Sequence, residues 1–469
     1  MTRYLIAAAG LVIAGAQLAS AGSAAKSLGK IPTVNLPRPA LEDSTPKIKP
    51  LPAKEWTVMV YMNGKNNVSS AADMNLNEME AVGTTGNVNV VAEAGFLKGK
   101  TYSVARYVVE KDADPKKIGS QAVESFNFRD MGDYKNAIDF VKWAKTNFPA
   151  KHYMLAIWNH GTGFFDHKTA PAKAKSKGIS FDDETGNYIT TPQLRQILSA
   201  AGGVDVLAFN ACLMSSAEVY EELNGQAKAV VASEDVMSAV GFDYASTIAT
   251  LDANPGISPA QAANVVGAGY LERIKMVMKH GVSGGQITIV DPSKTTGLDA
   301  AIKAWTQTVI SSKGDPAVMK AIQQALLQTP RYKTLLTDKD KQNITSFMGD
   351  LGVFVMLVNE GLKKADSPAA AAITASGSKL FASLKGMILA YDSVGGDDAG
   401  IPYEYSTGIS VYLPPRLDTI SQETLEGQAF AQEYAASAFA KSSGWGTFVK
   451  WLYSARPKIT GNDAAPAAN

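Results

Sequence analysis

Cysteine is almost absent from this sequence, since its 469 residues contain one, Cys212. A single thiol excludes an internal disulfide, and the chain has no HExxH pair, no Cys/His cluster spaced for zinc and no phosphate-binding glycine loop. In an oxidising compartment a lone thiol is a liability unless it is buried or used. The residues around Cys212 therefore carry most of the information about function.

An excess of charge of one sign is also missing. The chain has 45 basic and 44 acidic residues, a net charge of +1, and no dense Lys/Arg stripe. We therefore expect no binding of nucleic acid or of an anionic membrane surface. With 46% hydrophobic residues the chain can bury a sizeable core, and its length predicts two domains plus tails.

No hydrophobic run has the ~20 residues that a membrane-spanning helix needs. The N-terminal run, residues 4–18, follows Arg3 and ends in Ala19-Ser20-Ala21, a small-x-small cleavage pattern. A membrane anchor is the alternative, but the short run and the cleavage pattern favour removal. We predict a signal peptide over residues 1–21, export to a periplasm or out of the cell, and no membrane contact after its removal.

The remaining chain divides by composition. Residues 22–54 are rich in Pro, Ala, Ser and Lys and predict a leader or propeptide, and residues 457–469 predict a disordered tail. From 55 to 250, short apolar strands alternate with helices, which is typical of a parallel sheet covered on both faces. Residues 251–456 predict a mixed α/β region rich in helices, for example 380–391, with strands at 286–290 and 408–413.

Two predicted strands end in reactive side chains. Residues 153–158 lead into Asn159-His160-Gly161, and residues 204–209 lead into Asn210-Ala211-Cys212. Parallel strands emerge at one edge of a sheet, so neighbouring strands would bring imidazole and thiol together. The amides of Gly161 and Cys212 are candidates for an oxyanion hole. The helix after Cys212 is expected to lower the thiol pKa through its dipole.

Each feature taken alone has a simpler interpretation. A lone cysteine after a strand is usually a core residue, and His-Gly is usually a turn. Their matching positions favour catalysis. Among the other histidines, His152 precedes its strand, His167 lies in a Lys-rich loop and His280 follows a predicted helix. This leaves His160 as the base for Cys212.

The segment Gly281-Val282-Ser283-Gly284-Gly285 matches the G-x-S-x-G pattern of serine hydrolases. That motif requires a strand, then a turn, then a helix. Here a predicted helix precedes it and a strand follows, which favours a glycine-rich turn.

At the two strand ends the sequence resembles the clostripain family, within the larger group that includes caspases, gingipains and legumain. The resemblance lies in residues 156–163 and 209–214, and Cys212-Leu213-Met214 is closer to clostripain-like members than to caspases. Further similar stretches support it, namely 60–62 with Asn66-Asn67, 180–183, 232–234, 241–244 and 408–414.

The resemblance implies a caspase-like α/β/α sandwich with a mainly parallel central sheet, and hydrolysis of peptide or protein substrates. It implies His160 as general base and Cys212 as nucleophile, with an acyl-enzyme intermediate. No cofactor is required by this chemistry. Some members use calcium, for which Asp182 and Asp183 are candidate ligands; a solvated turn is the preferred interpretation of these acids.

Two departures from the family pattern affect specificity. Members that cut after Arg or Lys usually carry an acid two positions before the cysteine, where this chain has neutral Asn210. Lys65 stands where an aspartate is common, and a cation near the cleft would also disfavour basic substrates. We therefore expect a relaxed preference for Arg or Lys at the cleaved bond, unless three other acids supply the negative charge that recognises a basic side chain. These acids are Glu234, Asp235 and Asp243.

The loop 166–178 between the two strand ends is rich in lysine among small residues. Its lysines are Lys168, Lys173, Lys175 and Lys177. Family members mature by cutting such a loop, which makes self-processing one interpretation; a solvated basic loop is the other.

The leading functional prediction is an exported cysteine endopeptidase. A catalytically silent peptide-binding module on the same fold is the alternative, because Asn210 departs from the family pattern. A serine hydrolase centred on Ser283 is a third hypothesis, disfavoured by the order of elements.

Overall fold

The computed structural model describes residues 52–164, 178–332, 348–397, 400–413, 434–435 and 437–454. The predicted signal peptide, most of the leader, the lysine-rich loop and the tail lie outside these residues. Within them, no helix combines the length and the apolarity that crossing a bilayer would require.

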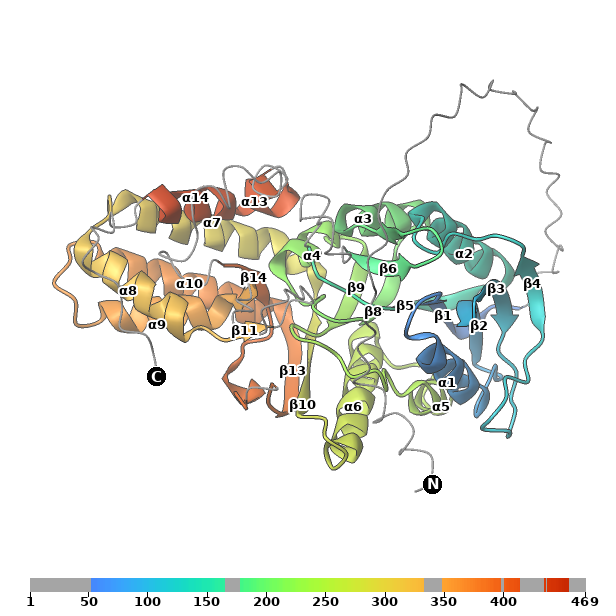
Figure 1. The fold of residues 1–469 in the computed structure, drawn as a ribbon. Coiled ribbons are helices and arrows are strands. Elements are labelled where there is room, and N and C mark those ends of the chain that lie inside the picture. Colours follow the sequence, from blue (N-terminus) through green and yellow to red (C-terminus); the bar gives the residue numbers. More distant parts are fainter. Residues whose placement is uncertain are drawn as a thin grey trace, which may run out of the picture.

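A nine-stranded sheet forms the centre of the described structure, in the order β13-β10-β9-β8-β5-β1-β2-β3-β4 (Figure 1). Its strands are β1 (Lys54–Gly64), β2 (Val88–Lys98), β3 (Thr101–Val108), β4 (Ala122–Phe126), β5 (Ala150–Trp158), β8 (Val204–Asn210), β9 (Ala227–Ala232), β10 (Gly284–Val290) and β13 (Ile388–Gly395). The middle strands β2, β1, β5, β8 and β9 pair in parallel, and the outer pairs are antiparallel. The predicted mainly parallel sheet is confirmed.

Helices cover both faces of this sheet, as the alternation of strands and helices predicts (Figure 1). One face carries α2 (Tyr134–Asn147), α3 (Thr191–Ala200) and α4 (Ala217–Glu222), and the other carries α1 (Ser69–Glu80), α5 (Tyr244–Ala253) and α6 (Pro259–Met278). Local sequence explains α2, because Asp133 caps its first turn and its apolar residues recur at helical spacing toward the core. The result is the predicted α/β/α sandwich.

The second half of the chain adds a group of helices beside the sandwich (Figure 1). They are α7 (Thr295–Ser311), α8 (Pro316–Gln328), α9 (Leu351–Leu362), α10 (Ala370–Met387), α13 (Ala438–Ser443) and α14 (Trp445–Ser454). The rings of Trp305, Phe354, Trp445 and Phe448 pack together between them. This aromatic cluster gives the region its own core.

The strands of the second half do not all follow the predicted pattern. The helix expected over 380–391 ends at Met387, and β13 begins at Ile388 because this segment pairs with β10 along one edge of the sheet. The strand expected at 408–413 is β14 (Ser410–Tyr412), in a small sheet with β11 (Arg331–Tyr332) and β12 (Met348–Asp350). The domain boundary at residue 250 stays a prediction, and the central sheet continues beyond it.

Candidate active site

The ends of β5 and β8 form the candidate site. These strands are parallel neighbours, with Trp158 opposite Asn210. His160 and Cys212 therefore each lie two residues beyond a paired position. The amide of Asn159 donates to the Asn210 carbonyl at 3.3 Å, which extends the ladder past the strands. The predicted adjacency of the two strand ends is confirmed.

Gly161 lets the two strand ends touch. A Cβ at this position would lie 2.4 Å from the Cys212 carbonyl oxygen and 3.0 Å from the Ala211 Cβ. The Gly161 amide is also close enough to the sulfur to lower the thiol pKa slightly against larger opposing effects. A glycine is thus required sterically here, and its amide lies on the side of the Cys212 sulfur.

Asn67 orients the imidazole, a contact that the sequence analysis did not identify. The Oδ1 atom of Asn67 lies 2.7 Å from Nε2 of His160. An amide oxygen only accepts, so Nε2 carries the proton and Nδ1 keeps its lone pair. The sequence contains a clue to this contact. Because β1 is the other parallel neighbour of β5, the polar residues after β1 emerge at the same sheet edge as His160.

Burial and one carboxylate act on His160 in opposite directions. Burial lowers the pKa of the imidazole, because desolvation disfavours the imidazolium. The negative charge of Asp183 opposes this shift. The half-buried ring is therefore neutral near pH 7, as a general base must be.

The Cys212 thiol is covered by the chain after β9. The residue is 8% exposed, and its sulfur accepts a hydrogen bond from the Met237 amide at 3.3 Å. Backbone bonds from Leu213 to Asp235 (3.2 Å) and from Ser215 to Ser233 (2.9 Å) join the two segments. Cys212 is therefore a buried cysteine in this conformation.

The expected lowering of the thiol pKa is wrong for this conformation. Burial raises the pKa of Cys212 to about 11, with a smaller opposing effect from the Met237 amide and a further rise from Asp235. Helix α4 begins at Ala217, and its first turn is capped by the Ser216 hydroxyl. The helix N-terminus is therefore too far along the chain to stabilise a thiolate.

Asn210 lies in a neutral, polar environment on the same face of β8 as Cys212. Its side-chain amide donates to the Tyr244 hydroxyl at 3.2 Å. Its near neighbour Asn75 accepts from the Trp158 indole at 2.8 Å, and a Cβ on Gly241 would contact both asparagine side chains. Amides and a phenol, rather than a carboxylate, therefore surround Asn210.

An ion pair between Glu78 and Arg273 adjoins this amide cluster. Asn75 donates to Glu78 at 3.3 Å, and Arg273 reaches both Glu78 carboxylate oxygens at 2.8 and 2.7 Å. Burial raises the pKa of Glu78 to about 7, against the lowering by Arg273. An arginine of the chain itself thus already pairs with this carboxylate.

The three acids predicted as substitutes for an acid at 210 have other partners. Glu234 accepts from the Tyr332 hydroxyl at 3.0 Å, and Asp235 accepts from the Tyr403 hydroxyl at 2.8 Å. Both contacts tie the end of β9 to the C-terminal region. Asp243 caps α5 through the Ser246 amide at 2.8 Å and lies beside Glu78. The structure does not bring these three carboxylates together around Asn210.

The donor set at Asp182 does not fit calcium. Its carboxylate accepts from the Met131 amide at 2.8 Å and the Glu184 amide at 3.0 Å, and pairs with the Lys65 ammonium at 2.9 Å. A cation thus already occupies that position, and Asp183 is exposed on the His160 side. Among the described residues, no group of three or more His, Cys, Asp or Glu side chains could hold a metal ion.

Lys65 itself differs from its predicted role. The sequence suggested a cation beside the cleft that would repel basic substrates. The side chain is instead buried, and two carboxylates neutralise it, Asp182 and Glu184.

Ser283 lies between α6 and β10, as expected for a glycine-rich turn. The lysines of the 166–178 loop lie outside the described residues.

Comparison with known proteins agrees with this geometry. A model of the clostripain family matches residues 60–451. Clostripain of Hathewaya histolytica is 28% identical over 218 residues, and the match spans 40% of this chain and 40% of that protein.

Two solved structures share the fold at low identity. A secreted C11 cysteine protease from Bacteroides thetaiotaomicron, in complex with an irreversible peptide inhibitor, has a TM-score of 0.58 and 20% identity over 84% of this chain and 99% of its own. An inactive zymogen C11 protease from Parabacteroides distasonis has a TM-score of 0.56 and 16% identity over 83% of this chain and 98% of its own. With the family model covering most of its length, the chain belongs to the clostripain family of cysteine peptidases.

Proposed function

We propose that this protein is an exported cysteine endopeptidase in which Cys212 is the nucleophile and His160 the general base. The observation that carries the proposal is the pairing of β5 with β8, from which both residues emerge at equivalent positions. The Asn67 contact adds support, because it gives the imidazole the tautomer that a base needs.

The proposed reaction follows from these atoms. Nδ1 of His160 takes the thiol proton, and the sulfur attacks the carbonyl carbon of the scissile peptide. The oxygen that becomes negative accepts hydrogen bonds from the Gly161 and Cys212 amides. His160 then gives the proton to the departing amine, leaving an acyl-enzyme. Water, deprotonated by the same nitrogen, releases the acid and restores the thiol.

Substrate binding must first uncover the sulfur. Burial raises the pKa of the thiol to about 11 even though the Met237 amide donates to the sulfur, so the thiol is protonated at neutral pH. We regard this arrangement as a resting conformation. Movement of the chain around Met237 would free the sulfur to approach His160, and the base would then generate the thiolate.

We propose that the enzyme prefers Arg or Lys at the cleaved bond only weakly, if at all. The Asn210 amide and the Tyr244 hydroxyl can hydrogen-bond a polar substrate side chain, but they supply no charge to pair with Arg or Lys. Glu78 adjoins the cluster, but Arg273 already neutralises it. Uncharged polar side chains therefore fit this cluster at least as well as basic ones.

Export, self-processing in the 166–178 loop and independence from calcium are further proposals that rest on the sequence and on the fit at Asp182. A silent binding module is the second candidate function. The covered thiol and the neutral Asn210 favour it.

One experiment separates the two candidates. The mature protein is exposed to a peptide library, with and without Ca²⁺, and Cys212 is labelled with a peptide-like electrophile. An enzyme cleaves peptides and labels in a His160-dependent way, whereas the Cys212→Ala and His160→Ala variants do neither. Labelling that is equal in the wild type and His160→Ala, with no cleavage, would establish the binding module.

A further inference from the structure

Lys65 is a buried cation directly after β1, close to the candidate site. Its residue exposure is 0%. The side chain crosses β2 at Gly95, where a Cβ would lie 2.9 Å from the Lys65 Cγ atom. The missing side chain of Gly95 thus leaves the space through which the lysine reaches inward.

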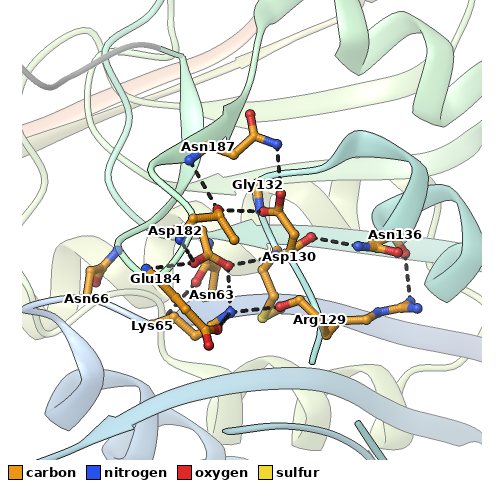
Figure 2. A network of polar contacts seen from close by, with 12 residues as sticks. Asn63, Lys65, Asn66, Arg129, Asp130, Gly132, Asn136, Asp182, Glu184 and Asn187 are labelled. Atoms are coloured by element: carbon orange, nitrogen blue, oxygen red, sulfur yellow. Dashed lines mark hydrogen bonds and ion pairs between the residues drawn. The ribbon is translucent and has the colours of Figure 1, made fainter. Parts of the chain in front are cut away.

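Three acceptors surround the ammonium, one for each of its protons (Figure 2). They are Asp182 Oδ2 at 2.9 Å, Glu184 Oε2 at 2.5 Å and the Arg129 carbonyl oxygen at 2.8 Å. A buried ammonium is costly unless it is paired and fully hydrogen-bonded. This one meets both conditions, so the lysine has one strongly preferred position.

The Lys65 backbone joins two turns to the same centre. Its amide donates to the Asn63 side chain, and its carbonyl accepts from the Asp183 amide, both at 3.1 Å. Asn63 and Asn66 both donate to the Phe181 carbonyl, at 3.0 and 2.8 Å. The 63–67 turn and the 180–184 turn are thus bound to each other through side chain and backbone, as Figure 2 shows in part.

Each turn presents one group to the imidazole. The first carries Asn67, which accepts from Nε2 of His160 at 2.7 Å. The second carries Asp183, whose charge opposes the effect of burial on the imidazole. Lys65 is part of the first turn and binds the second through its ammonium and its carbonyl. Among the ion pairs and hydrogen bonds of the described residues, the ammonium itself touches neither His160 nor Cys212.

We infer that Lys65 is a positioning residue for His160, whose buried ammonium locks the two turns together so that Asn67 and Asp183 face the imidazole from fixed positions. The inference rests on the proposed role of His160 as the base. Displacing a catalytic group by about 1 Å costs on the order of 100-fold in rate. A neutral side chain at position 65 would allow a displacement of this kind without removing any reacting atom.

The first test compares Lys65→Met with Lys145→Met. Lys145 lies on α2 and its ammonium also donates to backbone carbonyls, including that of Ala201 at 2.9 Å. These carbonyls belong to the loop before β8, at the sheet edge opposite the candidate site. We expect Lys65→Met to lose about 10- to 100-fold in kcat with KM little changed, and Lys145→Met to match the wild type. Equal kcat in a folded Lys65→Met protein would overturn the inference, and so would an equal loss in both variants.

A double-mutant cycle tests whether Lys65 acts through Asn67. If it does, Lys65→Met combined with Asn67→Ala loses little more than Asn67→Ala alone. Losses that multiply would show that Lys65 acts by another route. If Lys65→Met does not fold, Glu184→Gln replaces it in the cycle, because that partner is 32% exposed and its loss leaves the Asp182 pair intact.

Imidazole NMR of the wild type and Lys65→Met separates this inference from the proposed function. The wild type should show the Nε2-protonated tautomer of His160. In Lys65→Met the two tautomers should mix, and the His160 pKa should fall as Asp183 loses its fixed position. An unchanged spectrum refutes the positioning role. An inactive wild type with the expected spectral change would refute the peptidase and leave the positioning role supported.

Discussion

Replacing Asn210 by aspartate should convert this protein into a peptidase selective for basic residues. The change alters one atom of a side chain that is 6% exposed, and leaves the Tyr244 hydroxyl at hydrogen-bond distance (3.2 Å). The new carboxylate would lie on the same face of β8 as the nucleophile. This selectivity requires that a substrate side chain bound beside Cys212 reaches position 210.

The size of the effect follows from the burial of this position. Two opposite charges about 4 Å apart attract by about 4 kcal/mol at an effective dielectric constant of 20. Desolvation of the charges removes part of this gain, while charge pairs buried in interfaces retain about 1.5–7 kcal/mol. A net gain of about 2–4 kcal/mol corresponds to roughly 30- to 700-fold in kcat/KM for an Arg peptide over its Gln counterpart.

The assay compares kcat/KM for matched Arg and Gln peptides in the wild type and in Asn210→Asp, across pH. Burial will raise the pKa of the new carboxyl in the free enzyme, so the Arg preference should grow as pH rises through that pKa. Ser246→Asp, at an exposed site on α5, is a control for added charge. A wild type already strict for Arg or Lys, or an unchanged ratio in Asn210→Asp, would refute the reasoning.

Four other predictions follow from the site. Cys212→Ala and His160→Ala should abolish peptide cleavage with melting temperatures near that of the wild type; cleavage by either purified variant would exclude the dyad. Without substrate, alkylation of Cys212 should accelerate as pH rises toward the thiol pKa of about 11; a plateau near pH 7 would show that the thiolate already exists in the resting protein. Gly161→Ala should eliminate activity and destabilise the fold by about 1–3 kcal/mol, because its Cβ would lie 2.4 Å from the Cys212 carbonyl oxygen. Chemical denaturation measures the loss of stability and a cleavage assay the loss of activity. A fully active variant would mean that the strand ends are not in contact. Chelation with EDTA should leave cleavage unchanged, since Lys65 already supplies the cation at Asp182; loss of activity that Ca²⁺ restores would contradict this.

The pattern of apolar strands was sufficient to predict the sandwich, but it predicted the second half of the chain less well. The apolar runs that become β5 and β8 have the composition of strands buried on both faces, so the sheet could be predicted with His160 and Cys212 at its edge. The segment 388–395 has no such signal. Its helical spacing continues from α10, and its strand conformation depends on pairing with β10, about a hundred residues earlier in the chain.

The amino-acid sequence alone determined which residues are chemically able to react and that they stand at the ends of apolar strands, because residue type and alternation are local properties. Only the tertiary structure decided their environment. It showed that Asn67 directs the imidazole, that the chain around Met237 covers the sulfur, that burial raises the thiol pKa, and that Lys65 is internal rather than beside the cleft. Burial, tautomer and charge pairing depend on side chains that meet only when distant segments pack, and no local pattern encodes those distances.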